Sequence, residues 1–425
     1  MRVGLVTWGT EGDVRPFFAL AHALLARGHE VSVAYCNVEG RSFDALATTL
    51  GFRATAVGAD YFLSNREALF EAARRSLSSG NPMVQLRRIV RDLLDPIAPA
   101  LLEQALAMAE ANDVLVGHFL AYPITNAVAK VGRPALTVTL QPVYRSREYA
   151  PPGSPDLGRW LNPLLWRLAD SAMAGALQRP TNRQRVALGM APIERFDIGH
   201  FGPLEWGALA VSPSLFPRPS DWHPRAQVTG FLSMPESAEP WEPPREVGEF
   251  LAEGPPVFAS FGSMFNLDDV LTQEALRAFA GAAERERLRV LVQAPASLVE
   301  RAPRHPRLCY VQHCPHAQVF PRCSVIVHHG GAGTTQSSLL AGRPSVVVPH
   351  VTDQYLWGSV LHRQGAGSSP LRRTWLTAGR LAKRLRWVLD RPEVTARAEA
   401  LARELRAEDG CGAAAALVER VAAGP

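Results

Sequence analysis

The stretch 325–340, VIVHHGGAGTTQSSLL, indicates a buried strand followed by a glycine-rich loop and the start of a helix. A helix N-terminus with free backbone N–H groups binds anions, and hydroxyl or imidazole side chains beside it can donate further hydrogen bonds. The loop lacks the Gly-Lys-Ser/Thr ending of a P-loop, so it is not built to hydrolyse ATP with magnesium. A tight turn for close helix–strand packing is the alternative, but such a turn needs neither three glycines nor two histidines. We therefore predict that residues 328–335 form a phosphate-binding loop.

Short apolar runs alternate with helical patterns on both sides of this loop. Strand, helix and strand at this spacing imply right-handed crossovers and parallel sheets. The expected fold class is therefore α/β, with two doubly wound, Rossmann-like domains that face a cleft. Strands are predicted at 3–8, 31–35, 114–117, 135–140, 257–260, 290–292, 309–311, 325–328 and 345–348. Helices are predicted at 16–27, 41–50, near 83–111, at 121–131 and from 378 onward.

A proline-rich stretch separates the two halves. Ten of the 34 prolines fall within residues 212–256, and such a density disfavours regular helices and sheet ladders. We therefore predict a first domain over 1–211, a linker over 212–256 and a second domain over 257–425, with the last helices packing back toward the first domain.

Composition excludes several classes of protein. The 45 Lys and Arg residues against 40 Asp and Glu give a formal net charge of +5 without a basic stripe, so nucleic acid is not an expected partner. Five cysteines are too few for a disulfide framework in 425 residues. No signal-peptide pattern and no apolar stretch of about 18 residues occurs, which predicts a soluble, cytoplasmic protein without stable membrane insertion. A monomer or weak dimer is expected.

A second glycine-rich loop, GTEGDVRP at 9–16, follows the first predicted strand. It does not match the dinucleotide-binding pattern GxGxxG. Asp13 lies just before the predicted first helical turn, which places its carboxylate at the carboxyl edge of the sheet, where α/β proteins bind ligands. The alternative is that Asp13 only caps the helix.

Two further segments carry polar groups at strand ends. Gly262 and Ser263 follow the strand at 257–260 and could add a phosphate donor, although this segment also reads as an ordinary strand end. Asp353 and Gln354 follow the strand at 345–348 and suit the vicinal hydroxyls of a sugar, with a helix N-cap as the alternative. A metal site is not expected, because the cluster of Cys309, His313, Cys314, His316 and Cys323 matches no zinc spacing. No GxSxG elbow for serine hydrolysis follows a strand.

These four segments, in this order, resemble the UDP-glycosyltransferase family, whose members have two facing Rossmann-like domains (the GT-B fold). GTEGDVRP looks like the bacterial antibiotic, sterol and macrolide subgroup, in which this Asp stands where plant members carry a catalytic His. The stretch from Gln312 through Gln354 resembles the donor signature of the family.

The resemblance implies a role for each matching residue. It assigns the acceptor to the first domain and the nucleotide sugar to the second. The backbone of Cys314 and the side chain of His316 would meet the base, with His313 where plant members have a stacking Trp. Ser337 stands where plant members have a Glu that contacts the ribose. Plant members also have a second acid that orients the catalytic base; this acid is missing here, and His118 is the nearest polar substitute. The catalytic candidates are Asp13 and His118; the donor-binding candidates are Thr10, Gly12, Gly262, Ser263, His313, Cys314, His316, His329, Gly331, Gly333, Thr334, Asp353 and Gln354.

The implied activity is inverting, metal-independent transfer of a hexose, with glucose from UDP-glucose as the expected donor, to a hydroxyl of a lipophilic natural product. The acceptor is expected to be a polyketide, macrolide, sterol or similar molecule. Transfer from a dTDP-deoxysugar is an alternative, and a UDP-sugar epimerase or a non-catalytic partner of a glycosyltransferase are alternatives of other classes. No cofactor is expected besides the nucleotide sugar. The acceptor-binding candidates, each of which could instead be a core residue, are Tyr61, Phe62, Met83, Tyr144 and Trp160.

Overall fold

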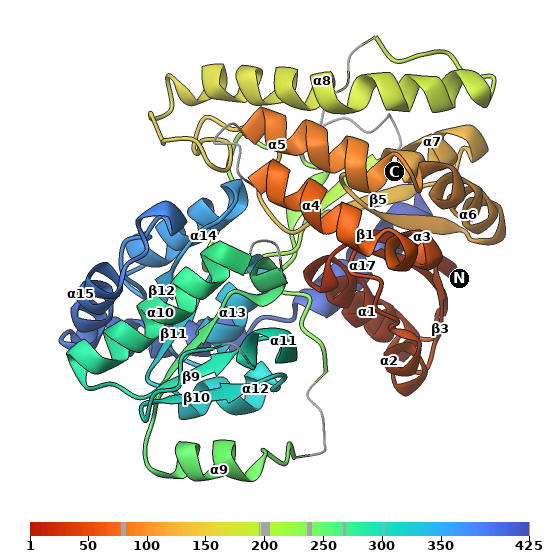
Figure 1. The fold of residues 1–425 in the computed structure, drawn as a ribbon. Helices are drawn as coiled ribbons and strands as arrows, with labels where there is room; N and C mark the ends of the chain where they lie inside the picture. The colour runs from red at the N-terminus through yellow and green to blue at the C-terminus, as the bar shows by residue number, and fades with distance from the viewer. Residues whose placement is uncertain are drawn as a thin grey trace. The chain divides into compact units, whose positions relative to one another are not determined.

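The structure is a computed structural model that describes residues 1–77, 82–194, 196, 205–235, 240–266, 269–300 and 302–424. The chain forms two compact units, one of Met1–Pro235 with Asp409–Pro425 and the other of Glu236–Glu408. Each unit is a parallel β-sheet flanked by helices, as expected for Rossmann-like domains (Figure 1).

The described part of the first unit contains a sheet of seven parallel strands in the order β3-β2-β1-β4-β5-β6-β7. The central strand β1 pairs with β2 on one side and β4 on the other, so Val3 lies beside both Val31 and Val114. This order places the loops after β1 and β4 next to each other at the carboxyl edge. The strands are β1 (Arg2–Gly9), β2 (Glu30–Asn37), β3 (Arg53–Ala56), β4 (Val114–His118), β5 (Ala135–Thr139), β6 (Glu205–Leu209) and β7 (Ala226–Val228).

Alternate residues of these strands build the core of the first unit. Val3 and Leu5 point to the face that is covered by α1 and the last helix, α17, and both side chains are fully buried. The helices of this unit are α1 (Glu11–Ala26), α2 (Asp44–Thr49), α3 (Ala59–Ser64), α4 (Arg66–Leu77), α5 (Pro82–Ile89), the π-helical turn Val90–Leu94, α6 (Ala98–Ala111), α7 (Tyr122–Val131), α8 (Asn162–Ala187) and α17 (Gly410–Ala423).

The second unit has a parallel sheet in the order β10-β9-β8-β11-β12, which places the ends of β8, β11 and β12 side by side. Its strands are β8 (Val257–Ser260), β9 (Val290–Gln293), β10 (Leu308–Val311), β11 (Val325–His328) and β12 (Ser345–Val347). Its helices are α9 (Arg245–Ala252), α10 (Asp269–Glu286), α11 (Ala296–Val299), α12 (His316–Val319), α13 (Ala332–Leu340), α14 (Thr352–Arg363), α15 (Ala378–Leu389) and α16 (Pro392–Arg406), with short 3-10 turns at Gly262–Asn266, Phe320–Arg322 and Arg373–Trp375.

The prediction of a linker over 212–256 is wrong in part. This stretch contains β7, the edge strand of the first sheet, and helix α9 of the second unit. An edge strand tolerates neighbouring prolines, and Pro244 at the N-cap of α9 is compatible with helix initiation. The boundary between the units falls at residue 235, and Gly410–Ala423 belongs to the core of the first unit.

Three other predicted boundaries need correction. Helix α1 begins at Glu11, not at Pro16, because Thr10 and Asp13 form a capping box there, so Asp13 lies inside the helix. The predicted helix at 83–111 is interrupted by a π-helical turn and a bend before α6. The strands β3 and β6 were not predicted. Strand β3 is short and mostly exposed, so it has little apolar pattern in the sequence. None of the helices in the described residues combines the length and apolar character that a membrane span requires.

Candidate functional site

Asp13 occupies the third position of helix α1, directly after the end of β1. Its Oδ2 accepts hydrogen bonds from the backbone N–H of Thr10 at 2.7 Å and from the Thr10 hydroxyl at 3.0 Å. This is the arrangement in which an acid in the first turn reaches back to the N-cap residue. The carboxylate therefore does cap the helix, but it uses only one of its two oxygens for this purpose.

Gly9 leaves the space in which the Asp13 carboxylate lies. It ends β1 with a φ of +141°, a value that L side chains rarely adopt. A Cβ atom at this position would collide with the carboxylate of Asp13. The glycine-rich loop thus serves to bring a carboxylate close to the backbone, which is a more specific function than making a turn.

His118 faces the other oxygen of Asp13. It ends β4, the neighbour of β1, and its Nε2 lies 3.5 Å from Oδ1 of Asp13. The Nδ1 atom of His118 accepts a hydrogen bond from the N–H of Leu120 at 3.4 Å, so a neutral ring carries its proton on Nε2. The ring is buried between aromatic neighbours, which fixes its orientation: Trp8, Phe17 and Phe119.

A second carboxylate lies near this pair and was not among the sequence-based candidates. Glu39 follows β2, and burial raises the pKa of its carboxyl group, while Arg41 opposes this shift and Glu11 and Asp13 add to it. Its only sequence signal is a charged residue directly after an apolar strand.

His329 defines the corresponding edge of the second unit. Its ring lies between Gly262, which follows β8, and Gly331, the N-cap of α13, because a Cβ at either glycine would contact the imidazole. Burial lowers the pKa of His329 to about 4, so the ring is neutral at physiological pH. Its Nδ1 is buried without a hydrogen-bond partner in the described structure.

The first turn of α13 supplies backbone donors beside this ring. The N–H groups at Ala332, Gly333 and Thr334 precede the first i to i−4 hydrogen bond, which joins Thr335 to Gly331. Gly333 is exposed and Thr334 is half-buried, so both are accessible to a ligand. The predicted loop of residues 328–335 therefore has the geometry of an anion site.

His328 and His350 are neutral structural groups. His328 is fully buried, its Nδ1 accepts from Gly330 N–H at 3.1 Å, and burial, followed by the nearby His329 and His316, lowers its pKa to about 3. Burial also lowers the pKa of His350, with smaller contributions from Arg373 and His329.

Asp353 and Gln354 begin helix α14, close to the His329 loop. A Cβ at Gly330 would approach the backbone oxygen of Gln354, which shows that the two segments touch. Oε1 of Gln354 accepts from the N–H groups of His350 at 2.7 Å and Val351 at 3.2 Å. The amide oxygen therefore caps its own helix. The Nε2 group of Gln354 and the half-buried Asp353 are the candidates for contact with a ligand.

Arg373 is a cation at this edge that sequence analysis missed. Its Nη1 donates to Nε2 of His350 at 3.2 Å, and Nδ1–H of His350 donates to the carbonyl of Val348 at 2.9 Å. The guanidinium also lies over the ring of Phe261, 5.6 Å from its centroid. Since Arg373 follows α14 by ten residues, at the start of a short 3-10 turn, no sequence pattern indicates its position.

The candidates for base recognition lie around the N-terminus of α12. His316 stacks on Phe320 at 4.3 Å and donates from Nε2 to Oε1 of Gln293 at 3.1 Å. The Cys314 thiol is buried, and burial raises its pKa to about 12. His313 is exposed. The side chain of Ser263 lies outside the described residues.

The acceptor-binding candidates differ in how deeply they are buried. Phe62 is buried against Tyr61, and Tyr144 is buried against Trp222, so both belong to the packed interior. Trp160 is instead 83% exposed. The side chain of Met83 lies outside the described residues.

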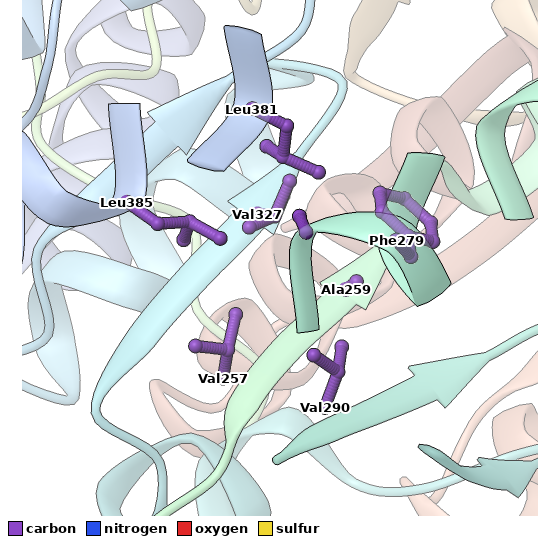
Figure 2. A pocket seen from close by; sticks show the side chains of 8 residues that line it. Val257, Ala259, Phe279, Val290, Val327, Leu381 and Leu385 are labelled. Atoms are coloured by element: carbon purple, nitrogen blue, oxygen red, sulfur yellow. The ribbon is translucent and has the colours of Figure 1, made fainter. Parts of the chain in front are cut away.

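Neither an apolar gap nor a metal cluster offers another site. Figure 2 shows a gap in the second core, between the sheet and helices α10 and α15, which is lined only by apolar side chains. A ligand site needs some polar groups to orient its ligand, so this gap is a packing feature. Among the described residues, no three His, Cys, Asp or Glu side chains are grouped to hold a metal ion.

Comparisons with known proteins identify the family. Residues 281–418 match the family described as erythromycin biosynthesis protein CIII-like, C-terminal domain. The O-mycaminosyltylonolide 6-deoxyallosyltransferase of Streptomyces fradiae is 30% identical over 442 residues, which cover 99% of this chain and 97% of that enzyme. The chain belongs to the UDP-glycosyltransferase family. This glycosyltransferase is also 29% identical to the sterol 3-beta-glucosyltransferase UGT80B1 of Arabidopsis thaliana, over 97% of the chain and 67% of that enzyme.

The GT-B fold of this glycosyltransferase agrees with solved structures. Glycosyltransferase VinC, solved in complex with DTDP, superposes with a TM-score of 0.67 at 20% identity, with complete coverage of both chains. The family resemblance and the GT-B fold predicted from the sequence are therefore confirmed. The protein is a hexosyltransferase, which argues against the epimerase and the non-catalytic partner.

Proposed function

We propose that the enzyme transfers a hexose, with inversion and without a metal ion, from a nucleotide diphosphate sugar to a hydroxyl of a lipophilic acceptor. The observation that carries this proposal is that Asp13 caps the helix with Oδ2 alone, while its Oδ1 faces His118. A residue that served only as a cap would not need a buried imidazole beside its second oxygen.

Asp13 is proposed to act as the general base toward the acceptor. The acceptor oxygen forms a bond to the anomeric carbon while the bond from that carbon to the diphosphate breaks, and the electron pair leaves with the diphosphate. The hydroxyl proton passes to Asp13 as the attacking oxygen gains positive character in the transition state, which makes this proton more acidic. Backside displacement of this kind inverts the configuration at the anomeric carbon.

His118 is proposed to position Asp13 rather than to take the proton itself. Its Nδ1 is occupied by Leu120 N–H, and its Nε2 faces Asp13. The ring therefore has no second nitrogen available for an acceptor hydroxyl. An N–H at Nε2 directed at Oδ1 would hold the carboxylate in one rotamer.

The diphosphate is proposed to lie at the start of α13. The N–H groups of Gly333 and Thr334, the helix dipole and the N–H of neutral His329 would stabilise the leaving diphosphate. These groups are fixed before the reaction, so no cation is required in this account. Cys314, His316 and exposed His313 are proposed to contact the base, and Gly262, Gly331 and Ser263 to line the phosphates. Thr10 and Gly12 are further proposed donor-binding residues.

UDP-glucose is the proposed donor. Asp353 and Nε2 of Gln354 can bind the 3- and 4-hydroxyls of glucose, which deoxysugars lack in part. The sterol glucosyltransferase relative supports glucose, whereas the 6-deoxyallosyltransferase relative and the DTDP complex of VinC support a dTDP-deoxysugar as the alternative. The names of the two relatives also support a sterol or a macrolide as the acceptor class.

A panel of nucleotide sugars and acceptors tests this function. The purified enzyme would be incubated with UDP-glucose, UDP-galactose or dTDP-sugars together with sterols, macrolides or flavonoids, and the products read by mass spectrometry. A mass increase of one hexosyl unit on an acceptor supports the proposal. Release of free sugar or of an epimerised nucleotide sugar, without any modified acceptor, would contradict it.

A further inference from the structure

An apolar patch lies on the surface of the first unit at the beginning of α8. Ten large hydrophobic side chains are exposed in the described residues, and five of them fall within residues 157–168. Their exposed fractions range from 48% to 83%, with Trp160 at the upper end. We call this set the α8 patch, and it consists of Leu157, Trp160, Leu161, Leu164 and Leu168.

The α8 patch is not the packing face of the helix. The opposite stripe of α8 holds Trp166, which is buried and donates from Nε1 to the carbonyl of Tyr149 at 2.9 Å. Along its length the helix packs against α5 and α7 (Figure 1). Because the helix already has a buried side, the residues at 161, 164 and 168 form a second apolar stripe that the first unit leaves exposed.

Exposed cations surround the patch. Arg159 lies over the ring of Trp160 at 5.5 Å, Arg167 is exposed on α8, and Arg87 of α5 approaches α8 at Gly175. The neighbouring acids are engaged within the protein: Asp156 accepts from Gly158 N–H and Asn162, and Asp170 is buried against Arg145. These three arginines outnumber the exposed carboxylate of Asp156, so the rim of the patch has a net positive charge.

We propose that the α8 patch docks this enzyme reversibly on a membrane surface that contains anionic lipids. Leucine and tryptophan side chains enter the boundary between headgroups and acyl chains, while arginines beside them pair with lipid phosphates. Five side chains within residues 157–168 are few for a stable protein interface, which uses about 20–30 residues on each side. The docking is peripheral, and it does not depend on the proposed function, although lipophilic acceptors would concentrate in the same layer.

Vesicle flotation tests this proposal. The parent protein would be mixed with vesicles of phosphatidylcholine alone or with about 30% phosphatidylglycerol at low salt. The parent should float with the anionic vesicles, and the triple variant Trp160→Ser, Leu164→Ser and Leu168→Ser should bind at least about tenfold more weakly, because each apolar side chain contributes to partitioning. The matched control is Trp375→Ser, since Trp375 is 53% exposed and lies between Arg372 and Arg380, but has no apolar stripe beside it.

A second variant keeps the test decisive if the triple variant does not fold. Arg159→Gln with Arg167→Gln changes only exposed charges, and it should weaken binding to anionic vesicles and reduce its dependence on salt. Binding of the triple variant equal to that of the parent, or failure of the parent to bind anionic vesicles, would overturn the proposal. A parent dimer in light scattering that the triple variant converts to a monomer, without lipid binding, would overturn it in favour of self-association.

Discussion

Nε2 of His118 and Oδ1 of Asp13 lie 3.5 Å apart, although the two residues are 105 positions apart in the sequence. They meet because β1 and β4 are neighbours in the first sheet and both end at the same edge. The other oxygen of Asp13 accepts hydrogen bonds from Thr10, so the two oxygens have different neighbours. This division of the carboxylate explains how one residue can cap a helix and still face a reaction partner.

His118→Ala should lower kcat by about 10- to 100-fold, because the Asp13 carboxylate loses the imidazole that faces its Oδ1. The KM for the acceptor should change little, because His118 acts through Asp13. His118→Gln, whose amide can present an N–H near the position of Nε2, should restore most of the activity. Steady-state kinetics of both variants check this, and equal losses in the two would indicate a purely structural role for the ring.

His328 should make the protein less stable in acid. Its pKa of about 3 lies below the ordinary value of 6.5, so the unfolded chain binds a proton that the folded chain does not between these pH values. Stability is therefore complete above pH 6.5 and is lost as the pH falls toward 3. His328→Asn keeps an acceptor for Gly330 N–H. This variant should reduce the slope of the unfolding free energy against pH by about 1.4 kcal/mol per pH unit below about pH 6.

Urea unfolding at pH 7, 6, 5 and 4 measures that slope. His313→Asn is the matched control, because His313 is exposed. An identical slope for the parent and His328→Asn would show that His328 becomes protonated without cost in the folded protein.

His329→Ala should weaken donor binding and also slow the departure of the diphosphate, so KM for the donor should rise and kcat should fall. The parent enzyme should keep its full activity in EDTA, since backbone donors and a neutral ring form the phosphate site in this account. Activity lost on chelation and restored by magnesium or manganese would show that a cation is needed.

Asp353→Ala should reduce the use of UDP-glucose by an amount that corresponds to about 1–3 kcal/mol, the loss of a charged hydrogen bond. Competition assays with UDP-glucose and a dTDP-deoxysugar measure the effect. Unchanged use of UDP-glucose by the variant, together with better use of the dTDP-sugar by the parent, would show that the proposed donor is wrong.

The order of strands and glycine-rich loops could be predicted because apolar runs bounded by glycine are local signals. The loops at 9–16 and 328–335 were located in this way, and both lie at carboxyl edges in the structure. The proline-rich stretch misled the prediction, since an edge strand such as β7 can form between prolines that flank it.

Tertiary contacts could not be predicted in the same way. Arg373 meets His350, and Glu39 lies near Asp13, only because the sheet brings strand ends together. The engagement of Gln354 Oε1 in capping α14 depends likewise on the backbone path of residues 350–351. A sequence shows that such residues follow strands, but not which of their atoms are already paired.

Asp13→Asn tests the central claim most directly. The amide oxygen can still accept from Thr10, whereas the group facing His118 is no longer a base, and any loss of capping costs only about 0.5–2 kcal/mol of stability. We expect a folded variant that binds UDP-glucose like the parent in calorimetry but transfers sugar about 10²- to 10⁴-fold more slowly. An Asp13→Asn enzyme with more than about a tenth of the parental turnover would contradict the account and leave Asp13 as a helix cap.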